Sequence, residues 1–218
     1  MSALPANAPT RSSYDVVIIG GAMLGSATAW FLSHNPDFTG TVLVIERDPT
    51  YEFAATSHTN SCIRQQFSNR LNVEISQFGA DFVQNLPRYM GPEAPKLKIQ
   101  NFGYMYLANT QAGADYLRAS YAVQSAAGAA TRLLSAEEIA AEYPFYDTSD
   151  LILGSINTQD EGYFDGITLF DHFRRGARAK GVEYLANEVT ALSRHAGRIT
   201  SLTLKSGETI ACGQIVNA

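Results

Sequence analysis

The residues best suited to chemistry in this 218-residue chain are a glycine-rich turn and an acid twenty-one residues after it. Residues 20–25 (GGAMLG) match the pattern GxGxxG except that Ala22 replaces the middle glycine. Gly20 would allow a tight turn, and Gly25 would let a helix approach a strand closely. The amides that open the helix would then face the diphosphate of a nucleotide, while Glu46 accepts hydrogen bonds from its ribose.

The secondary-structure elements around this turn decide whether the glycine pattern indicates a nucleotide-binding site. Residues 14–19 (YDVVII) and 41–46 (TVLVIE) predict two buried parallel strands, and residues 23–33 predict the helix between them, which together form a βαβ unit. The alternative is an ordinary βα turn followed by an unrelated acid. Ala22 weakens the match, because its methyl group would stand where the backbone meets the pyrophosphate.

Composition excludes several classes of protein. Hydrophobic residues make up 45% and charged residues 17% of the chain, which is typical of a globular protein and not of a disordered one. A net charge of −5 makes nucleic acid an improbable partner. Cys62 and Cys212 have no partner at metal-ligand spacing, so we expect neither a zinc site nor a disulfide scaffold. No spanning apolar run or signal peptide is evident, and we expect a cytoplasmic protein.

The rest of the chain predicts further elements in a regular order. Helices are expected at residues 71–89, 111–127 and 168–180, with a short helix opened by a capping box at Ser135. Strands are expected at residues 97–100, 103–108, 151–157 and 182–186. Residues 189–194, 198–204 and 208–211 predict an antiparallel meander, and residues 214–217 begin one more buried strand.

Five segments, taken in this order, resemble the D-amino acid oxidase and sarcosine oxidase-like (DAO) family of FAD-dependent oxidoreductases. They are DVVIIGGAMLGSATAWFL, VIERD, SHTNSCIRQQFS, DEGYFD and QIVNA. The resemblance implies an α/β fold: a Rossmann-like FAD-binding domain of the glutathione-reductase type, with a β-meander and an interleaved α+β segment of a substrate domain. It divides the chain into a flexible tail at 1–13, the FAD domain at 14–95 and 160–218, and the first substrate-domain segment at 96–159.

The resemblance also implies positions that would hold FAD. The diphosphate would be met by Gly20, Ala22, Met23 and Gly25. The adenosine would be met by Glu46, Arg47 and Val189, and the rest of the cofactor by Ser57 and Ser61. Val189 could equally be an ordinary core residue of a strand. Relatives usually carry glycines, as GGIR, in the loop that passes the flavin ring, whereas this chain reads Ser61, Cys62, Ile63, Arg64.

Two side chains in that loop are candidates for catalysis. Arg64 would stabilise the negative charge of reduced flavin, the alternative being a surface ion pair. His58 lies where some relatives place a histidine close to the flavin, although a plain loop histidine is an equal alternative and a covalent bond is not implied at this spacing. Cys62 could be redox-active if exposed, while a buried thiol is the commoner outcome.

The implied reaction is oxidation of a C–N bond of an amino acid or N-methyl amine by hydride transfer to flavin. Because relatives usually continue well beyond VVNA, we expect an amino-terminal part whose site is completed by a missing carboxyl-terminal half or a second chain. Alone, it should bind FAD weakly or not at all and show little oxidase activity. One alternative is a non-catalytic flavoprotein that acts as an assembly or scaffold factor, because the IRQQFS stretch resembles relatives with that role. The other is an NAD-binding dehydrogenase domain.

Overall fold

The computed structural model describes residues 8–218, which divide into two compact units. The first unit contains the residues up to Thr59 together with Gly166–Ala218, and the second is Asn60–Asp165. Residues 1–7 of the predicted tail lie outside the described residues. Thr10, in the described part of that tail, is attached to the first unit, because its backbone N–H donates to Glu183 Oε1 at 2.8 Å.

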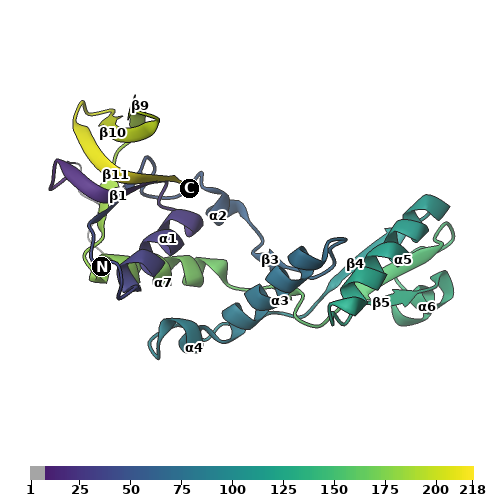
Figure 1. Ribbon diagram of the computed structural model, residues 1–218. Coiled ribbons are helices and arrows are strands. Elements are labelled where there is room, and N and C mark those ends of the chain that lie inside the picture. Colours follow the sequence, from purple (N-terminus) through teal and green to yellow (C-terminus); the bar gives the residue numbers. More distant parts are fainter. Residues whose placement is uncertain (1–7) are drawn as a thin grey trace. The chain divides into compact units, whose positions relative to one another are not determined.

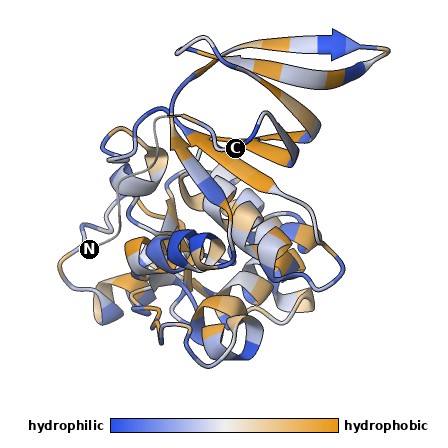
Figure 2. Cartoon of the chain, turned by 90° about the vertical axis from the view of Figure 1, so that its left-hand side faces the viewer, coloured by the Kyte–Doolittle hydropathy of each residue, from blue (hydrophilic) through white to orange (hydrophobic). Residues whose placement is uncertain are grey.

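A six-stranded sheet forms the centre of the first unit, in the order β8-β2-β1-β11-β10-β9. Its parallel part consists of β1 (Ser13–Ile19), β2 (Val42–Glu46), β8 (Glu183–Ala186) and the end of β11 (Thr209–Asn217). The centre of this sheet is hydrophobic (Figure 2), and residues 16–18 of β1 and 42–45 of β2 are buried at every position, as expected for central parallel strands. The predicted βαβ unit is confirmed, and so is the α/β fold class.

The last strand differs from its prediction. Residues 208–211 and 214–217 were expected to form two strands, but β11 runs unbroken through Gly213. Its first half pairs antiparallel with β10 (Arg198–Leu204), which pairs in turn with β9 (Val189–His195), as the predicted meander requires. Gly213 fits because a Cβ there would lie 2.8 Å from the Asp15 carbonyl oxygen, so the missing side chain permits close strand pairing.

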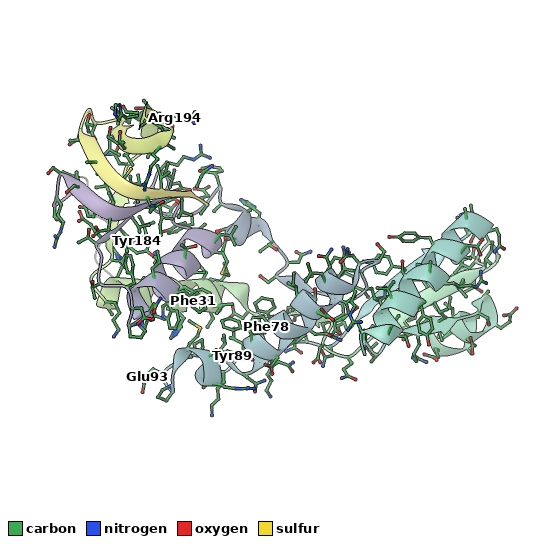
Figure 3. All side chains as sticks on the ribbon, in the orientation of Figure 1. Phe31, Phe78, Tyr89, Glu93, Tyr184 and Arg194 are labelled. Atoms are coloured by element: carbon green, nitrogen blue, oxygen red, sulfur yellow. The ribbon has the colours of Figure 1, made fainter. Side chains whose placement is uncertain are left out.

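Helix α1 (Met23–His34) packs against α7 (Gly166–Ala179) in the first unit. The Trp30 ring lies 6.1 Å from that of Phe173, and a Cβ at Gly176 would come within 2.6 Å of Trp30, so glycine lets the helices approach. Tyr184 on β8 (Figure 3) donates to Ser26 Oγ at 3.0 Å and joins the sheet to α1. Burial raises the pKa of Tyr184 to about 12.

The second unit contains two small sheets and a set of helices (Figure 1). One sheet pairs β3 (Cys62–Ile63) with β7 (Gly162–Tyr163), and the other has the order β4-β6-β5, with β4 at Tyr104–Ala108, β6 at Leu153–Asn157 and β5 at Arg132–Leu134. The helices are α3 (Arg70–Gln84), α4 (Leu86–Met90), α5 (Gln111–Ala126) and α6 (Ala136–Glu142). The capping box predicted at Ser135 is confirmed. The remaining short helix, α2 (Ala55–His58), belongs to the first unit.

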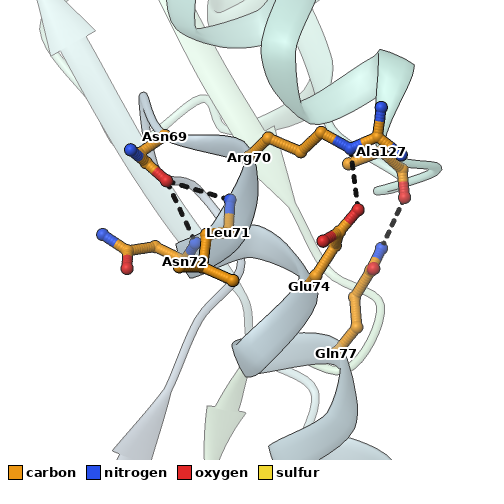
Figure 4. A network of polar contacts seen from close by, with 7 residues as sticks. All are labelled: Asn69, Arg70, Leu71, Asn72, Glu74, Gln77 and Ala127. Carbon is orange, nitrogen blue, oxygen red and sulfur yellow. Dashed lines mark hydrogen bonds and ion pairs between the residues drawn. The ribbon is translucent and has the colours of Figure 1, made fainter.

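The single helix predicted at residues 71–89 is in fact two. Asn85 leaves the helical conformation, with φ of −120° and ψ of 32°, and Pro87 has no N–H to continue the hydrogen-bond ladder of α3. The Phe78 and Tyr89 rings, 5.7 Å apart, hold the two pieces together (Figure 3). At its other end, α3 is capped by Asn69, and Gln77 donates to the carbonyl of Ala127 at 3.0 Å (Figure 4).

The observed units also differ from the predicted domains. Residues 60–95 and 160–165 are predicted to belong to the nucleotide-binding domain, but their contacts place them in one unit with residues 96–159. The predicted strand at 97–100 is absent, since only Gln100 makes a bridge, to Tyr163. None of the helices within residues 8–218 has the length and apolar character that crossing a bilayer requires.

Candidate active site

A cleft of about 560 Å³ opens in the first unit where strands β1, β2 and β11 end. Its walls are the turn after β1, the start of α1, the residues after β2, the Phe53–Thr56 segment, and residues 187–189. The carboxyl ends of parallel strands are the usual place for a ligand in an open α/β sheet. This volume falls in the range of small-molecule sites.

The turn after β1 depends on two of its glycines. Gly20 has a φ of 94°, and a Cβ there would lie 2.4 Å from the Ala218 carbonyl oxygen. A Cβ on Gly25 would lie 1.9 Å from the Gly20 carbonyl oxygen. Ala22 needs no glycine, because it is the helix N-cap in extended conformation, with φ of −72°. The turn therefore keeps its shape despite the alanine.

The first turn of α1 offers backbone donors to the cleft. The Met23 N–H donates to Thr56 Oγ1 at 3.2 Å. Among the described residues 8–218, the N–H groups of Leu24 and Gly25 have no hydrogen-bond acceptor. The first turn also contains no acidic residue. Donors at the positive end of a helix dipole make this end of the cleft suitable for an anion.

Glu46 ends β2 and brings a carboxylate to the same cleft. Its Oε2 accepts from the Gly21 N–H and its Oε1 accepts from the Asp48 N–H, each at 2.8 Å. These two bonds fix the carboxylate, and the side chain is only partly buried. Each oxygen retains acceptor capacity, because a carboxylate offers about four lone-pair sites. A pair of hydroxyl groups, such as those of a ribose, is a suitable donor.

Arg64 belongs to the second unit, where aromatic rings surround it. Its guanidinium carbon lies 4.8 Å from the Phe67 ring centroid and 5.8 Å from that of Tyr106, and it donates to the Tyr106 hydroxyl. Within the part of the chain that the structure describes, no carboxylate pairs with Arg64, so the surface ion pair is not observed. The Phe67 ring, the Tyr106 ring and the Tyr106 hydroxyl are neutral, so the positive charge of Arg64 can still attract an anion.

A buried carboxylate fixes the chain directly after Arg64. Glu161 is fully buried, and its Oε1 accepts from the Gln65 N–H at 2.5 Å and from Asn157 Nδ2 at 3.2 Å. Its Oε2 accepts from Gln66 Nε2 at 3.0 Å. Desolvation raises the pKa of Glu161, although hydrogen bonds from Gln65, Gln66 and Asn157 oppose the shift. The Gln66 Oε1 also accepts from the Ser155 hydroxyl at 2.7 Å.

The structure brings most, but not all, of the predicted cofactor residues together. The cleft is lined by Gly20, Ala22, Met23, Gly25, Glu46, Arg47 and Val189. Ser57 does not line it and instead donates to the Tyr51 carbonyl at 2.6 Å. His58 is exposed, with Nε2 at 2.6 Å from the Glu52 carbonyl oxygen, while Ser61 and Arg64 belong to the second unit.

Sequence reasoning missed Thr56, whose hydroxyl meets the first amide of α1. Nothing in the pattern distinguishes it from the neighbouring Ser57, because both carry hydroxyls and only the turn of α2 decides which one faces the cleft. Cys62 is exposed and shares a small hollow with Arg64 and Tyr104.

Relatives and solved structures agree on the class of protein. The chain is 35% identical to FAD-dependent oxidoreductase domain-containing protein 1 of Xenopus laevis over 184 residues, and 37% identical to that of Bos taurus over 187 residues. These alignments cover 82% and 84% of this chain. The chain spans only 37% and 38% of the length of these two relatives.

Two solved structures have a similar fold. The L-proline dehydrogenase of P. horikoshii matches with a TM-score of 0.74 at 24% identity, over 99% of this chain and 53% of that protein. The glycine oxidase of Geobacillus kaustophilus matches with a TM-score of 0.71 at 19% identity, over 95% of this chain and 55% of that protein. The model of the family described as FAD dependent oxidoreductase (DAO) matches residues 15–218. This chain therefore belongs to the DAO family of FAD-dependent oxidoreductases.

Proposed function

We propose that this protein oxidises a C–N bond of an amino acid or N-methyl amine with FAD, and that its cleft holds the adenosine diphosphate portion of the cofactor. The observation that carries the proposal is the conjunction of open amides on α1 with the Glu46 carboxylate in one cleft. A phosphate-binding turn without the acid, or an acid without the turn, would support no particular ligand.

The residues present fit this part of FAD. The spaces that a Cβ would fill at Gly20 and Gly25 are occupied by carbonyl oxygens, so glycine at both positions allows the backbone of the turn to pack closely. The N–H groups of Leu24 and Gly25 would donate to the diphosphate, and the Thr56 hydroxyl can donate there while it accepts from Met23. Glu46 would accept from the adenosine ribose.

FAD supplies a hydride acceptor when it is bound. The contribution proposed for this chain is electrostatic: Arg64, held by Phe67 and Tyr106, provides a positive charge that would stabilise developing negative charge. Glu161 keeps the following residue, Gln65, in place and so limits the movement of Arg64. No side chain is assigned as a general base, because an amine that binds in its neutral form can lose hydride without one.

The names of structurally similar proteins support the substrate class. The two solved structures described above are an L-proline dehydrogenase and a glycine oxidase, and each name refers to an amino acid. Their identities of 24% and 19% establish the fold alone, so the amine substrate is our inference.

Turnover on the native protein, purified from its own cells, tests the proposal. We expect flavin absorbance in the purified protein, and loss of that absorbance without oxygen when one member of a panel of N-methyl, D- and L-amino acids is added. Bound flavin that no amine reduces would favour the non-catalytic flavoprotein. Binding of NAD in place of flavin would contradict the proposal and favour a dehydrogenase.

A further inference from the structure

Phe53 is a large aromatic side chain on the wall of the cleft that the proposed phosphate and ribose contacts do not use. It is 79% exposed, although it lines the cleft together with Glu46, Arg47 and Thr56. Folding does not bury this ring against any core, so core packing does not explain an apolar side chain there. An exposed aromatic ring on the wall of a ligand cleft is suited to cover the ligand.

The loop that carries Phe53 is fixed before any ligand binds. Asp48 Oδ2 accepts from the Phe53 N–H at 3.2 Å, and Asp48 Oδ1 accepts from the Thr50 N–H at 3.0 Å. Tyr51 anchors the middle of the loop, because it is 6% exposed and its ring centroid lies 4.9 Å from that of Phe170. The ring at position 53 is therefore presented by a preorganised loop, which lowers the entropy cost of binding.

The same contacts place Phe53 near the ribose end of the cleft. Glu46 Oε1 accepts from the Asp48 N–H, and the Asp48 carboxylate accepts from the Phe53 N–H. One residue thus links the proposed ribose acceptor to the backbone of Phe53. A nucleotide whose ribose is bound by Glu46 would have its base or sugar within reach of this ring.

We propose that Phe53 is an additional cofactor-binding residue that packs its ring on the adenosine of FAD. This inference rests on the proposed function of the cleft and adds to it a contact that neither the glycine pattern nor the family resemblance indicates. A base can stack on an aromatic side chain without sequence-specific hydrogen bonds, because every base has a π-face.

Calorimetric titration of the native protein, freed of its bound flavin, and of its Phe53→Ala and Phe53→Tyr variants tests this contact. The probes are ADP, FAD and inorganic pyrophosphate. Phe53→Ala should weaken ADP and FAD by about 5- to 150-fold, the range of aromatic–base stacking, and leave pyrophosphate unchanged. Phe53→Tyr should bind all three probes as the wild type does. Phe145→Ala, which removes a ring that is 76% exposed in the second unit, is the matched control.

The outcomes separate this inference from the proposed function. If the wild-type chain binds ADP and Phe53→Ala binds it equally well, the inference is wrong and the cleft still holds the nucleotide. If Phe53→Ala weakens pyrophosphate as much as ADP, the ring does not act on adenosine and the inference is again overturned. If the wild-type chain binds neither ADP nor FAD, both the inference and the proposed function of the cleft fail.

Discussion

Two glutamates, one in each unit, accept backbone N–H groups but stand in opposite surroundings. Glu46 accepts from Gly21 and Asp48 at the edge of a cleft and is only partly buried. Glu161 accepts from Gln65, Gln66 and Asn157 and is fully buried. Both are carboxylates fixed by hydrogen bonds, yet only Glu46 can be reached by a ligand.

Because the two glutamates differ in burial, Glu46 is suited to bind a ligand and Glu161 to stabilise the fold. On a partly exposed carboxylate, water can occupy a free acceptor position at little cost in free energy. A ribose hydroxyl can therefore replace this water at Glu46. A buried carboxylate must have its lone pairs filled by the protein, because leaving buried donors or acceptors unpaired costs free energy. We therefore expect changes at Glu46 to alter affinity and changes at Glu161 to alter folding.

Replacing Glu161 by alanine should have the largest effect. It would leave three buried donors without acceptors, and at roughly 1–3 kcal/mol for each such group we expect the free energy of unfolding to fall by about 3–9 kcal/mol. Urea unfolding followed by circular dichroism measures this. A loss below about 1 kcal/mol would show that Glu161 does not hold the network together.

Replacing Glu46 by alanine should weaken ADP binding and leave folding nearly unchanged. A hydrogen bond to a charged group contributes about 1.5–3 kcal/mol, so the dissociation constant should rise about 10- to 150-fold. Calorimetry with ADP measures the affinity, and thermal unfolding checks stability. Glu188→Ala, at another acid lining the cleft, is the control, and equal losses in both variants would contradict a specific role for Glu46.

The free energy of unfolding should depend on pH through Glu161 in the second unit. Because burial raises the pKa of Glu161 above its ordinary value of 4.5, its folded form binds the proton more tightly than the unfolded chain. Its stabilising contribution is therefore fully present below about pH 4.5 and is lost as pH rises through the raised pKa. Unfolding of the wild type and Glu161→Gln across this range should show the wild type losing stability relative to the variant. A constant difference would contradict the direction of this shift.

The smallest effect is expected at Ser61, three residues before Arg64. Its φ of 49° lies in the left-handed region, which costs a non-glycine residue about 1–2 kcal/mol. Part of the gain from glycine is offset by the greater freedom of the unfolded chain, so Ser61→Gly should raise the free energy of unfolding by about 0.5–1 kcal/mol. A decrease in denaturant unfolding would indicate that the serine side chain contributes more than its backbone costs.

Local patterns predicted the first unit well. The β-branched runs before Gly20 and up to Glu46, with the glycine turn between them, required a βαβ unit, and the structure contains it. The Ser135 capping box likewise identified α6, because its reciprocal hydrogen bonds are local in sequence. Helical periodicity could not reveal the break between α3 and α4, since the apolar spacing continues across Asn85.

Features that depend on contacts distant in sequence were not predictable. Gly213 resembled a break between two strands, and only its approach to Asp15 explains an unbroken β11. The division at Thr59 and Asn60 also depends on three-dimensional contacts, because no change in composition marks it. For the same reason, Thr56 and Phe53 emerged as cleft residues only once the loop after β2 was folded.

The most direct test of the central claim is the electron density of the cofactor in crystals of the native protein grown with FAD. We predict density for the diphosphate within hydrogen-bonding distance of the N–H groups of Leu24 and Gly25, and a ribose bound by the Glu46 carboxylate. Cofactor density at another surface, with the Glu46 carboxylate still bonded only to the Gly21 and Asp48 amides, would contradict the account.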